Sequence, residues 1–92
     1  MINTMKVKLL ATLRNITDCN ELELEVENIQ EVVEKLIELY GEEMKTELLE
    51  SDQLDETITI LVNGRNMLYL NGLKTKLKRN DIVTIFPQVA GG

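Results

Sequence analysis

The sequence contains no histidine and no tryptophan, and it has one cysteine, Cys19, and one proline, Pro87. A single cysteine cannot close an internal disulfide, and without histidine or a second cysteine the usual zinc ligands are missing. No histidine is present to activate Cys19 as a nucleophile, so we expect this thiol to be incidental. The composition therefore predicts a chain that binds neither a metal nor a cofactor of its own.

Long apolar segments are also missing. No stretch approaches the roughly 20 apolar residues that a membrane span needs, and Met1–Lys6 lacks the apolar core of a signal peptide. Sixteen acidic against ten basic residues give a net charge of -6, which repels nucleic-acid phosphates. We expect a cytoplasmic protein without a membrane or nucleic-acid partner, and 92 residues fit a single small domain.

Two segments near the start alternate between apolar and polar residues. Met5–Ala11 and Glu21–Val26 both show this period of two, which predicts two strands, each with one buried face. Between them, Arg14–Asn20 is rich in turn-forming residues, so an antiparallel hairpin is the simplest connection. The exposed Lys6 and Lys8 would then face glutamates on the second strand, which supports the pairing.

A helix is predicted after this hairpin. Asn28 is suited to cap its first turn, and Glu31, three residues later, can complete a reciprocal capping arrangement. Gly41 is a natural C-terminal stop. Apolar residues between these signals follow the spacing of one buried helical stripe: Ile29, Val32, Val33, Leu36, Ile37 and Tyr40.

The middle of the chain is less regular. Glu42–Leu49 is acidic and loosely amphipathic, so we expect either a short helix or an irregular excursion, and Ser51–Glu56 reads as a polar loop. Thr57–Val62 is rich in β-branched residues and predicts a strand that ends in a turn at Asn63–Gly64. Met67–Leu70 is compatible with another short strand.

The last structured segment is predicted to be a central strand. After a basic, loop-like stretch at Leu73–Arg79, Ile82–Phe86 is nearly apolar on both faces, and Pro87 stops it because proline cannot donate to the ladder. The order of elements predicts an α+β domain over residues 1–87, with one mixed sheet and one main helix packed across a face. Residues 88–92 form a flexible tail in this interpretation.

The tail carries the chemistry that the rest of the chain lacks. Gly91 and Gly92 have no side chains, so they can enter a narrow cleft in a partner enzyme. A free α-carboxylate, with a pKa of about 3.5, is a poor electrophile at neutral pH and needs activation, for example as an acyl-adenylate. The chain has no phosphate-binding GxxxxGK[ST] loop, so we expect a partner to bind the ATP. The predicted reacting group is the carboxylate of Gly92.

Several segments resemble the small, sulfur-carrying subunit of molybdopterin synthase. They are Ile60–Gly64, Leu77, Asp81–Pro87 and Val89–Gly92. The resemblance implies a ubiquitin-like β-grasp fold, in agreement with the order of elements. One departure is Gln88, where that family usually has a second proline.

The resemblance also implies a function and partners. An adenylating enzyme would activate Gly92, a sulfur donor would convert it to a thiocarboxylate, and the large synthase subunit would accept the tail. Sulfur would then pass to a pterin precursor of the molybdenum or tungsten cofactor. The chain would not be catalytic alone. Thiamine-pathway carriers and ubiquitin-like modifiers share the fold and the Gly-Gly end, so both stay open as alternatives, as does an interaction domain without any reaction at Gly92.

Residues near the tail are candidates for partner binding. Phe86 is either a docking residue or a core residue, and Pro87, Gln88 and the segment Val89–Ala90 would accompany the tail into the partner. Arg65, just after the predicted turn, could orient a carboxylate of the partner through two hydrogen bonds, or serve solubility alone.

Overall fold

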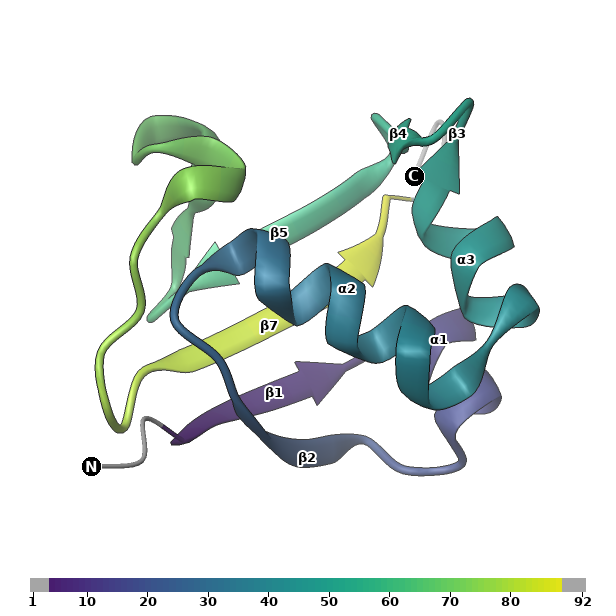
Figure 1. Ribbon diagram of the computed structural model, residues 1–92, viewed down its shortest axis with the longest axis horizontal. Coiled ribbons are helices and arrows are strands. Elements are labelled where there is room, and N and C mark those ends of the chain that lie inside the picture. Colours follow the sequence, from purple (N-terminus) through teal and green to yellow (C-terminus); the bar gives the residue numbers. More distant parts are fainter. Residues whose placement is uncertain (1–3, 89–92) are drawn as a thin grey trace.

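The computed structural model describes residues 4–88 and contains one central sheet with five strands (Figure 1). The strand order is β2-β1-β7-β5-β6. β1 and β7 run parallel and the other pairs run antiparallel, so the predicted mixed sheet is confirmed. The strands are β1 (Thr4–Leu9), β2 (Glu21–Glu25), β5 (Ile58–Val62), β6 (Arg65–Asn66) and β7 (Ile82–Pro87).

The predicted hairpin between the first two strands is also confirmed. Lys6 lies opposite Glu23 and Lys8 opposite Glu21. The Lys6 Nζ also comes within 3.9 Å of the Glu21 Oε2, on the diagonal. Both side chains are largely exposed, so this pair contributes at most a few tenths of a kcal/mol. Its value is in matching the register of the two strands.

The connection between these strands differs from the prediction of a turn-rich loop. α1 (Thr12–Thr17) occupies most of it, and β1 ends at Leu9, so Ala11 is not a strand residue. Ala11 has φ 57° and ψ -131°, a backbone region that favours glycine, and it turns the chain into the helix. The helix was missed because six residues, with Leu13 as the buried one, are too short for a periodic pattern.

The main helix, α2 (Ile29–Tyr40), forms as predicted. The Glu31 N–H donates to the Asn28 Oδ1 at 2.8 Å, and the Glu31 Oε1 accepts from the N–H of Glu27, one residue before the cap, also at 2.8 Å. Gly41 ends the helix with φ 76°. The capping signal in the sequence therefore specifies both ends of the helix.

The middle segment forms a helix followed by a small hairpin. Of the two structures predicted for Glu42–Leu49, a short helix or an irregular excursion, the helix is present as α3 (Glu42–Leu48). Met44 and Leu48 are its buried residues. β3 (Leu49–Glu50) and β4 (Gln53–Leu54) then pair across a tight turn, so the segment Ser51–Glu56, which we predicted to be a polar loop, contains the turn and β4. Sequence analysis missed this hairpin because its turn contains no glycine and its two-residue strands are too short to show an alternating pattern.

The predicted strand at Met67–Leu70 is wrong. A 3-10 helix, η1 (Met67–Tyr69), forms instead, because the Asn66 Oδ1 accepts a hydrogen bond from the Leu68 N–H and caps a turn there. A second 3-10 helix, η2 (Gly72–Lys74), lies in the basic stretch. As a result β6 has only two residues beside β5.

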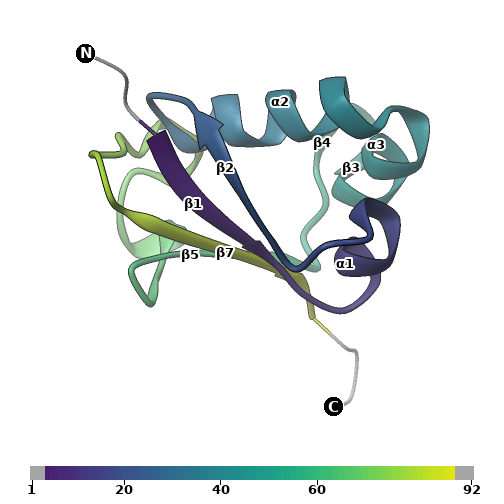
Figure 2. The same ribbon diagram turned by 90° about the horizontal axis from the view of Figure 1, so that it is seen from below.

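The helices cover one face of the sheet, and the core lies between them (Figure 2). α2 and α3 lie on this side, while no helix of residues 4–88 covers the other face. None of the helices in that range is long and apolar enough to cross a membrane. The completely buried core includes Met5, Val7, Leu9, Ile29, Val32, Leu36, Met44, Leu48, Val83 and Ile85.

The Asn28 cap gives a first test of this fold. Asn28→Ala removes the side-chain acceptor for the Glu31 N–H, so the free energy of unfolding should fall by about 1 kcal/mol. Urea denaturation followed by circular dichroism measures this change. Asn15→Ala, an exposed substitution within α1, is the control and should not destabilise the fold. Equal effects of the two substitutions would contradict the assigned cap.

The backbone at Ala11 gives a second prediction. Ala11→Gly should raise the free energy of unfolding by about 1 kcal/mol, because glycine adopts this conformation without the strain that a Cβ brings. Thermal and urea unfolding report the difference. A variant less stable than the parent would contradict the prediction, because the greater flexibility of glycine in the unfolded chain would then outweigh the relief of strain at position 11.

Candidate functional site

The middle strand of the sheet leads directly to the predicted reactive tail. Phe86 pairs with Thr59 and Pro87 with Ile58, and the Gln88 N–H donates to the Thr57 carbonyl oxygen. The prediction that Pro87 stops the strand is therefore wrong: β7 includes Pro87, and the ladder continues one residue past it. The predicted tail residues Val89, Ala90, Gly91 and Gly92 lie outside the described residues.

β1 supports the other side of this strand. Leu9 pairs with Ile85, and the Leu10 N–H donates to the Ile85 carbonyl oxygen at 3.1 Å. β7 is thus held between two neighbours as far as Ile85, and by β5 alone from Phe86 to Gln88. We call this end of the sheet, formed by Phe86, Pro87 and Gln88, the tail end.

Phe86 lies on the uncovered face of the sheet. Residues alternate along β7, with Val83 and Ile85 buried toward the helices, whereas Phe86 is half-buried and points to the opposite side. Its partner across the ladder is the half-buried Thr59. Phe86 is therefore not part of the main core, and its position at the tail end suits a contact with a partner. That role stays a prediction.

An aspartate that sequence analysis overlooked helps to fix the tail end. The Asp55 Oδ1 accepts hydrogen bonds from the Thr57 N–H at 2.8 Å and the Thr57 Oγ1 at 2.7 Å. The Asp55 carbonyl oxygen accepts from the Ile58 N–H at 3.0 Å. These bonds hold the start of β5, to which Gln88 is attached. The spacing Asp-x-Thr is a known turn signal and could have predicted this arrangement.

The hydrogen bonds from Thr57 also affect the charge of Asp55. Both the backbone N–H and the side-chain hydroxyl stabilise the carboxylate, so the pKa of Asp55 is lower than its ordinary value. Asp55 is therefore negative throughout the neutral pH range. A negative charge therefore lies next to the tail end.

Arg65 lies away from the tail end. It pairs with Val62, and Val62 pairs with Val83, which is three residues before Phe86 along β7, or about 10 Å. The structure therefore does not bring Arg65 together with Phe86, Pro87 and Gln88. Its predicted contact with a partner stays untested.

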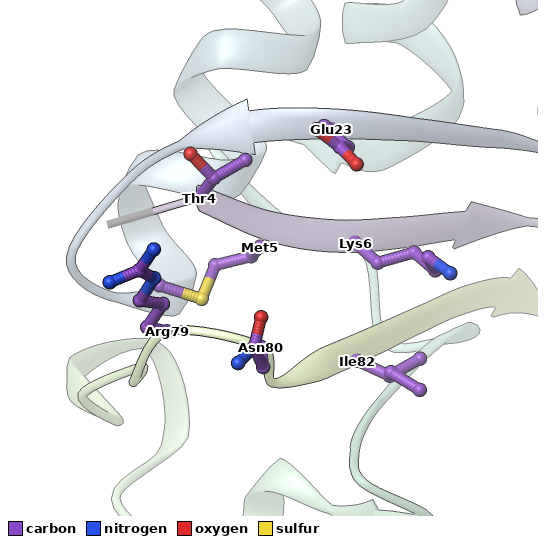
Figure 3. A pocket seen from close by; sticks show the side chains of 7 residues that line it. All are labelled: Thr4, Met5, Lys6, Glu23, Arg79, Asn80 and Ile82. Atoms are coloured by element: carbon purple, nitrogen blue, oxygen red, sulfur yellow. The ribbon is translucent and has the colours of Figure 1, made fainter. Parts of the chain in front are cut away.

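The basic stretch also lies toward the opposite end of the sheet. The Ile29 N–H donates to the Thr75 carbonyl oxygen, and the Leu77 N–H donates to that of Glu27, so this stretch is attached to the beginning of α2. Beyond it, a hollow of about 820 Å³ opens beside the start of β1 (Figure 3). Lys6 and Arg79 line this hollow together with Thr4, Met5, Glu23, Asn80 and Ile82.

Comparisons with known proteins agree with this fold and identify the family. The ThiS family matches residues 7–92, nearly the whole chain. The chain belongs to this family. A protein of Archaeoglobus fulgidus that is named as a sulfur carrier is 33% identical over 90 residues, which make up 96% of this chain and 98% of that protein.

Two solved structures of ThiS-like proteins show the same ubiquitin-like β-grasp fold. Small archaeal modifier protein 1 from Methanosarcina acetivorans has a TM-score of 0.89 and 35% identity, over 100% of this chain and 99% of its own. A Pyrococcus furiosus protein named as molybdopterin converting factor, subunit 1, has a TM-score of 0.74 and 27% identity. The match covers 95% of this chain and 99% of that protein. The predicted fold is confirmed, and the chain belongs with sulfur carriers and ubiquitin-like modifiers.

The lowered pKa of Asp55 predicts a pH dependence of stability. When the pKa of a carboxyl group is lower in the folded than in the unfolded protein, the ionised group stabilises the fold at pH values above its pKa in the unfolded protein. This stabilisation is lost as the pH falls through the pKa of the group in the folded protein. The parent protein should therefore lose more stability than Asp55→Asn when the pH falls below about 4. Urea denaturation at a series of pH values measures both proteins, and parallel profiles would contradict the assignment.

Proposed function

We propose that the chain is a sulfur carrier whose Gly92 carboxylate is converted to a thiocarboxylate by partner proteins. The observation that supports this most directly is that β7, the middle strand of the sheet, leads directly to Gln88, four residues before Gly92. The family match to residue 92 supports the same conclusion. In this proposal the domain presents the tail, and the partner supplies the catalytic groups.

The chemistry needs two steps. A Gly92 carboxylate oxygen attacks the α-phosphorus of ATP, which forms an acyl-adenylate and releases pyrophosphate. A hydrosulfide equivalent from a sulfur donor then attacks the carbonyl carbon, which breaks the bond to AMP and leaves the thiocarboxylate, with a proton going to solvent. The adenylating partner binds the ATP, since this sequence has no phosphate-binding loop.

We propose more specifically that the acceptor is a pterin precursor, and that the chain is the small subunit of molybdopterin synthase. The segments Ile60–Gly64 and Asp81–Pro87 support this role through their resemblance to that subunit, as does the Pyrococcus furiosus protein. The large synthase subunit would bind the tail and hold the pterin. Exclusion of water from that cleft would protect the thiocarboxylate from hydrolysis.

Intact-mass spectrometry tests the proposal directly. After incubation with ATP, the cognate adenylating enzyme and a sulfide source, the chain should gain the mass difference between one sulfur and one oxygen atom. A variant that lacks Gly91 and Gly92 is the matched control and should gain nothing. If the adenylating enzyme is active on another carrier but the mass of the parent chain does not change, the proposal is wrong.

A second candidate is a ubiquitin-like modifier, in which Gly92 forms an isopeptide bond with a lysine. The likeness to small archaeal modifier protein 1 favours it specifically. A tagged chain should then give larger covalent adducts that survive denaturation and reducing agent, whereas a thiocarboxylate alone gives none. Binding or cellular effects that persist without Gly91 and Gly92 would instead support an interaction domain that makes no use of the carboxylate.

A further inference from the structure

A groove runs along α2 on the side of the β3–β4 hairpin and has a volume of about 480 Å³. The residues that α2 contributes follow the spacing of one helical face: Gln30, Val33, Glu34 and Ile37. The first and last of them are seven positions apart, or about 10 Å along the helix axis. The hairpin and Leu73 of η2 supply the remaining walls. We call this feature the α2 groove.

The interior of the α2 groove is aliphatic. Within residues 4–88, eight apolar side chains pack against the core but are only partly buried. Four of these eight line the groove, namely Ile37, Leu49, Leu54 and Leu73. Single exposed apolar residues are normal on a protein surface, whereas a group of them around one hollow is typical of an interaction site. The volume of the groove also falls in the range of binding clefts.

The charged residues of the α2 groove are both acidic. Glu34 and Asp52 line it and are exposed, and no lysine or arginine of residues 4–88 does so. Neither carboxylate forms an ion pair within that range, and the one hydrogen bond to them comes from the Gln30 Nε2 to Glu34 at 3.3 Å. Lys35, which follows Glu34 in the sequence, lines a different hollow together with Glu25 of β2. We call Glu34 and Asp52 the acidic rim.

The hairpin that carries Asp52 has a defined conformation. Its turn residues Ser51 and Asp52 have φ 53° and 65°, and a two-residue hairpin turn of this kind requires the left-handed region at both positions. Glycine and asparagine adopt this region with less strain than serine does. At the base of the hairpin, the Asp55 N–H donates to the Leu48 carbonyl oxygen at 2.8 Å. The packing of the hairpin on the core therefore fixes an unfavourable turn, and this turn places Asp52 at the rim.

We infer that the α2 groove binds an amphipathic helix of the protein that works on the tail, with apolar side chains in the groove and lysine or arginine at the acidic rim. A helix fits because the groove follows α2 for two turns, and an apolar stripe of a second helix packs along such a length. Cations fit because the two charges of the groove are unpaired carboxylates.

The position of the α2 groove suits a partner that receives the tail. Leu54 in its wall is three residues from Thr57, a span of at most about 11 Å. The Thr57 carbonyl oxygen accepts the hydrogen bond from the Gln88 N–H, at the base of the tail. A helix bound in the groove therefore holds its own protein close to the tail end.

This inference rests on the proposed function for the identity of the partner, but its binding test does not. The probe is a synthetic peptide, acetyl-Lys-Leu-Leu-Lys-Lys-Leu-Leu-Lys-Lys-Leu-Leu-Lys-amide, added to the isotope-labelled full chain and followed by NMR. Saturable shifts should appear at Val33–Ile37 and Leu49–Leu54. The matched peptide with glutamate in place of lysine should bind at least about tenfold more weakly. The peptide with serine in place of leucine should show no saturable binding, because it has no apolar stripe.

Two charge reversals test the acidic rim. Glu34→Lys and Asp52→Lys should each weaken binding of the lysine peptide by about tenfold. Glu38→Lys, one turn further along α2, and Asp18→Lys, another exposed aspartate with a left-handed backbone, change the same residue types outside the groove. These two controls should change the affinity by less than about twofold, since solvent and salt screen charges outside the groove. Retained folding of all four variants is checked by their NMR spectra.

Other occupants would give different results. If shifts at Val33–Ile37 appear on concentrating the chain without peptide, a second copy binds in the groove; if the peptide binds only after removal of Val89–Gly92, the chain's own tail occupies it. Either result overturns the inference. Equal binding of the lysine and glutamate peptides, equal weakening by all four substitutions, or no saturable binding at millimolar peptide overturns it as well.

The α2 groove and the proposed function can fail separately. Peptide binding by a chain that forms no thiocarboxylate would support the groove and reject the proposed function alone. A chain that forms the thiocarboxylate but does not bind the lysine peptide would reject the groove and leave the proposed function in place.

Discussion

The parallel ladder between β1 and β7 joins the beginning of the described chain to its end, and the other elements depend on it. Lys6 lies opposite Ile82 and Leu9 opposite Ile85. These contacts are far apart in the sequence, so their formation requires the closure of a long loop. β2 then attaches to β1 and β5 to β7, and α2 packs over the buried side chains that both central strands supply.

Charged side chains lie at both ends of the sheet. Arg65 and Arg79 lie toward the end where β7 begins, whereas Asp55 and Glu56 lie next to Gln88, where it finishes. Lys8 pairs with Thr84, two residues before Phe86, so both signs of charge lie near the tail end.

The sequence was most informative where one local signal was sufficient. Asn28 with Glu31 specified the beginning of α2, and the apolar run before Pro87 specified the central strand. The short elements were missed because their structure depends on a single atom or torsion angle. The Asn66 side chain turned Met67–Tyr69 into a 3-10 helix, and the backbone of Ala11 started α1.

The candidate site was predictable to a similar extent. Phe86 was expected at the base of the tail, and it lies in β7 just before it; Gln88 was assigned to the tail, whereas its N–H is bonded to Thr57. Arg65 was chosen for its chemistry, but only the strand register shows that it is level with Val83, about 10 Å along β7 from Phe86, and two strands away from β7.

The hydrogen bond from Gln88 to Thr57 limits the distance between the sheet and the Gly92 carboxylate, which is the proposed reacting group. Because the chain is held by the sheet up to Gln88, only four residues separate this anchor from the end of Gly92, and even fully extended they span no more than about 14 Å. An enzyme that acts on the carboxylate must bring its catalytic centre within this reach of the domain. Under the proposed function, such an enzyme could not bind the end of the chain as if it were a free peptide, and the surface of the domain would lie close to its catalytic centre.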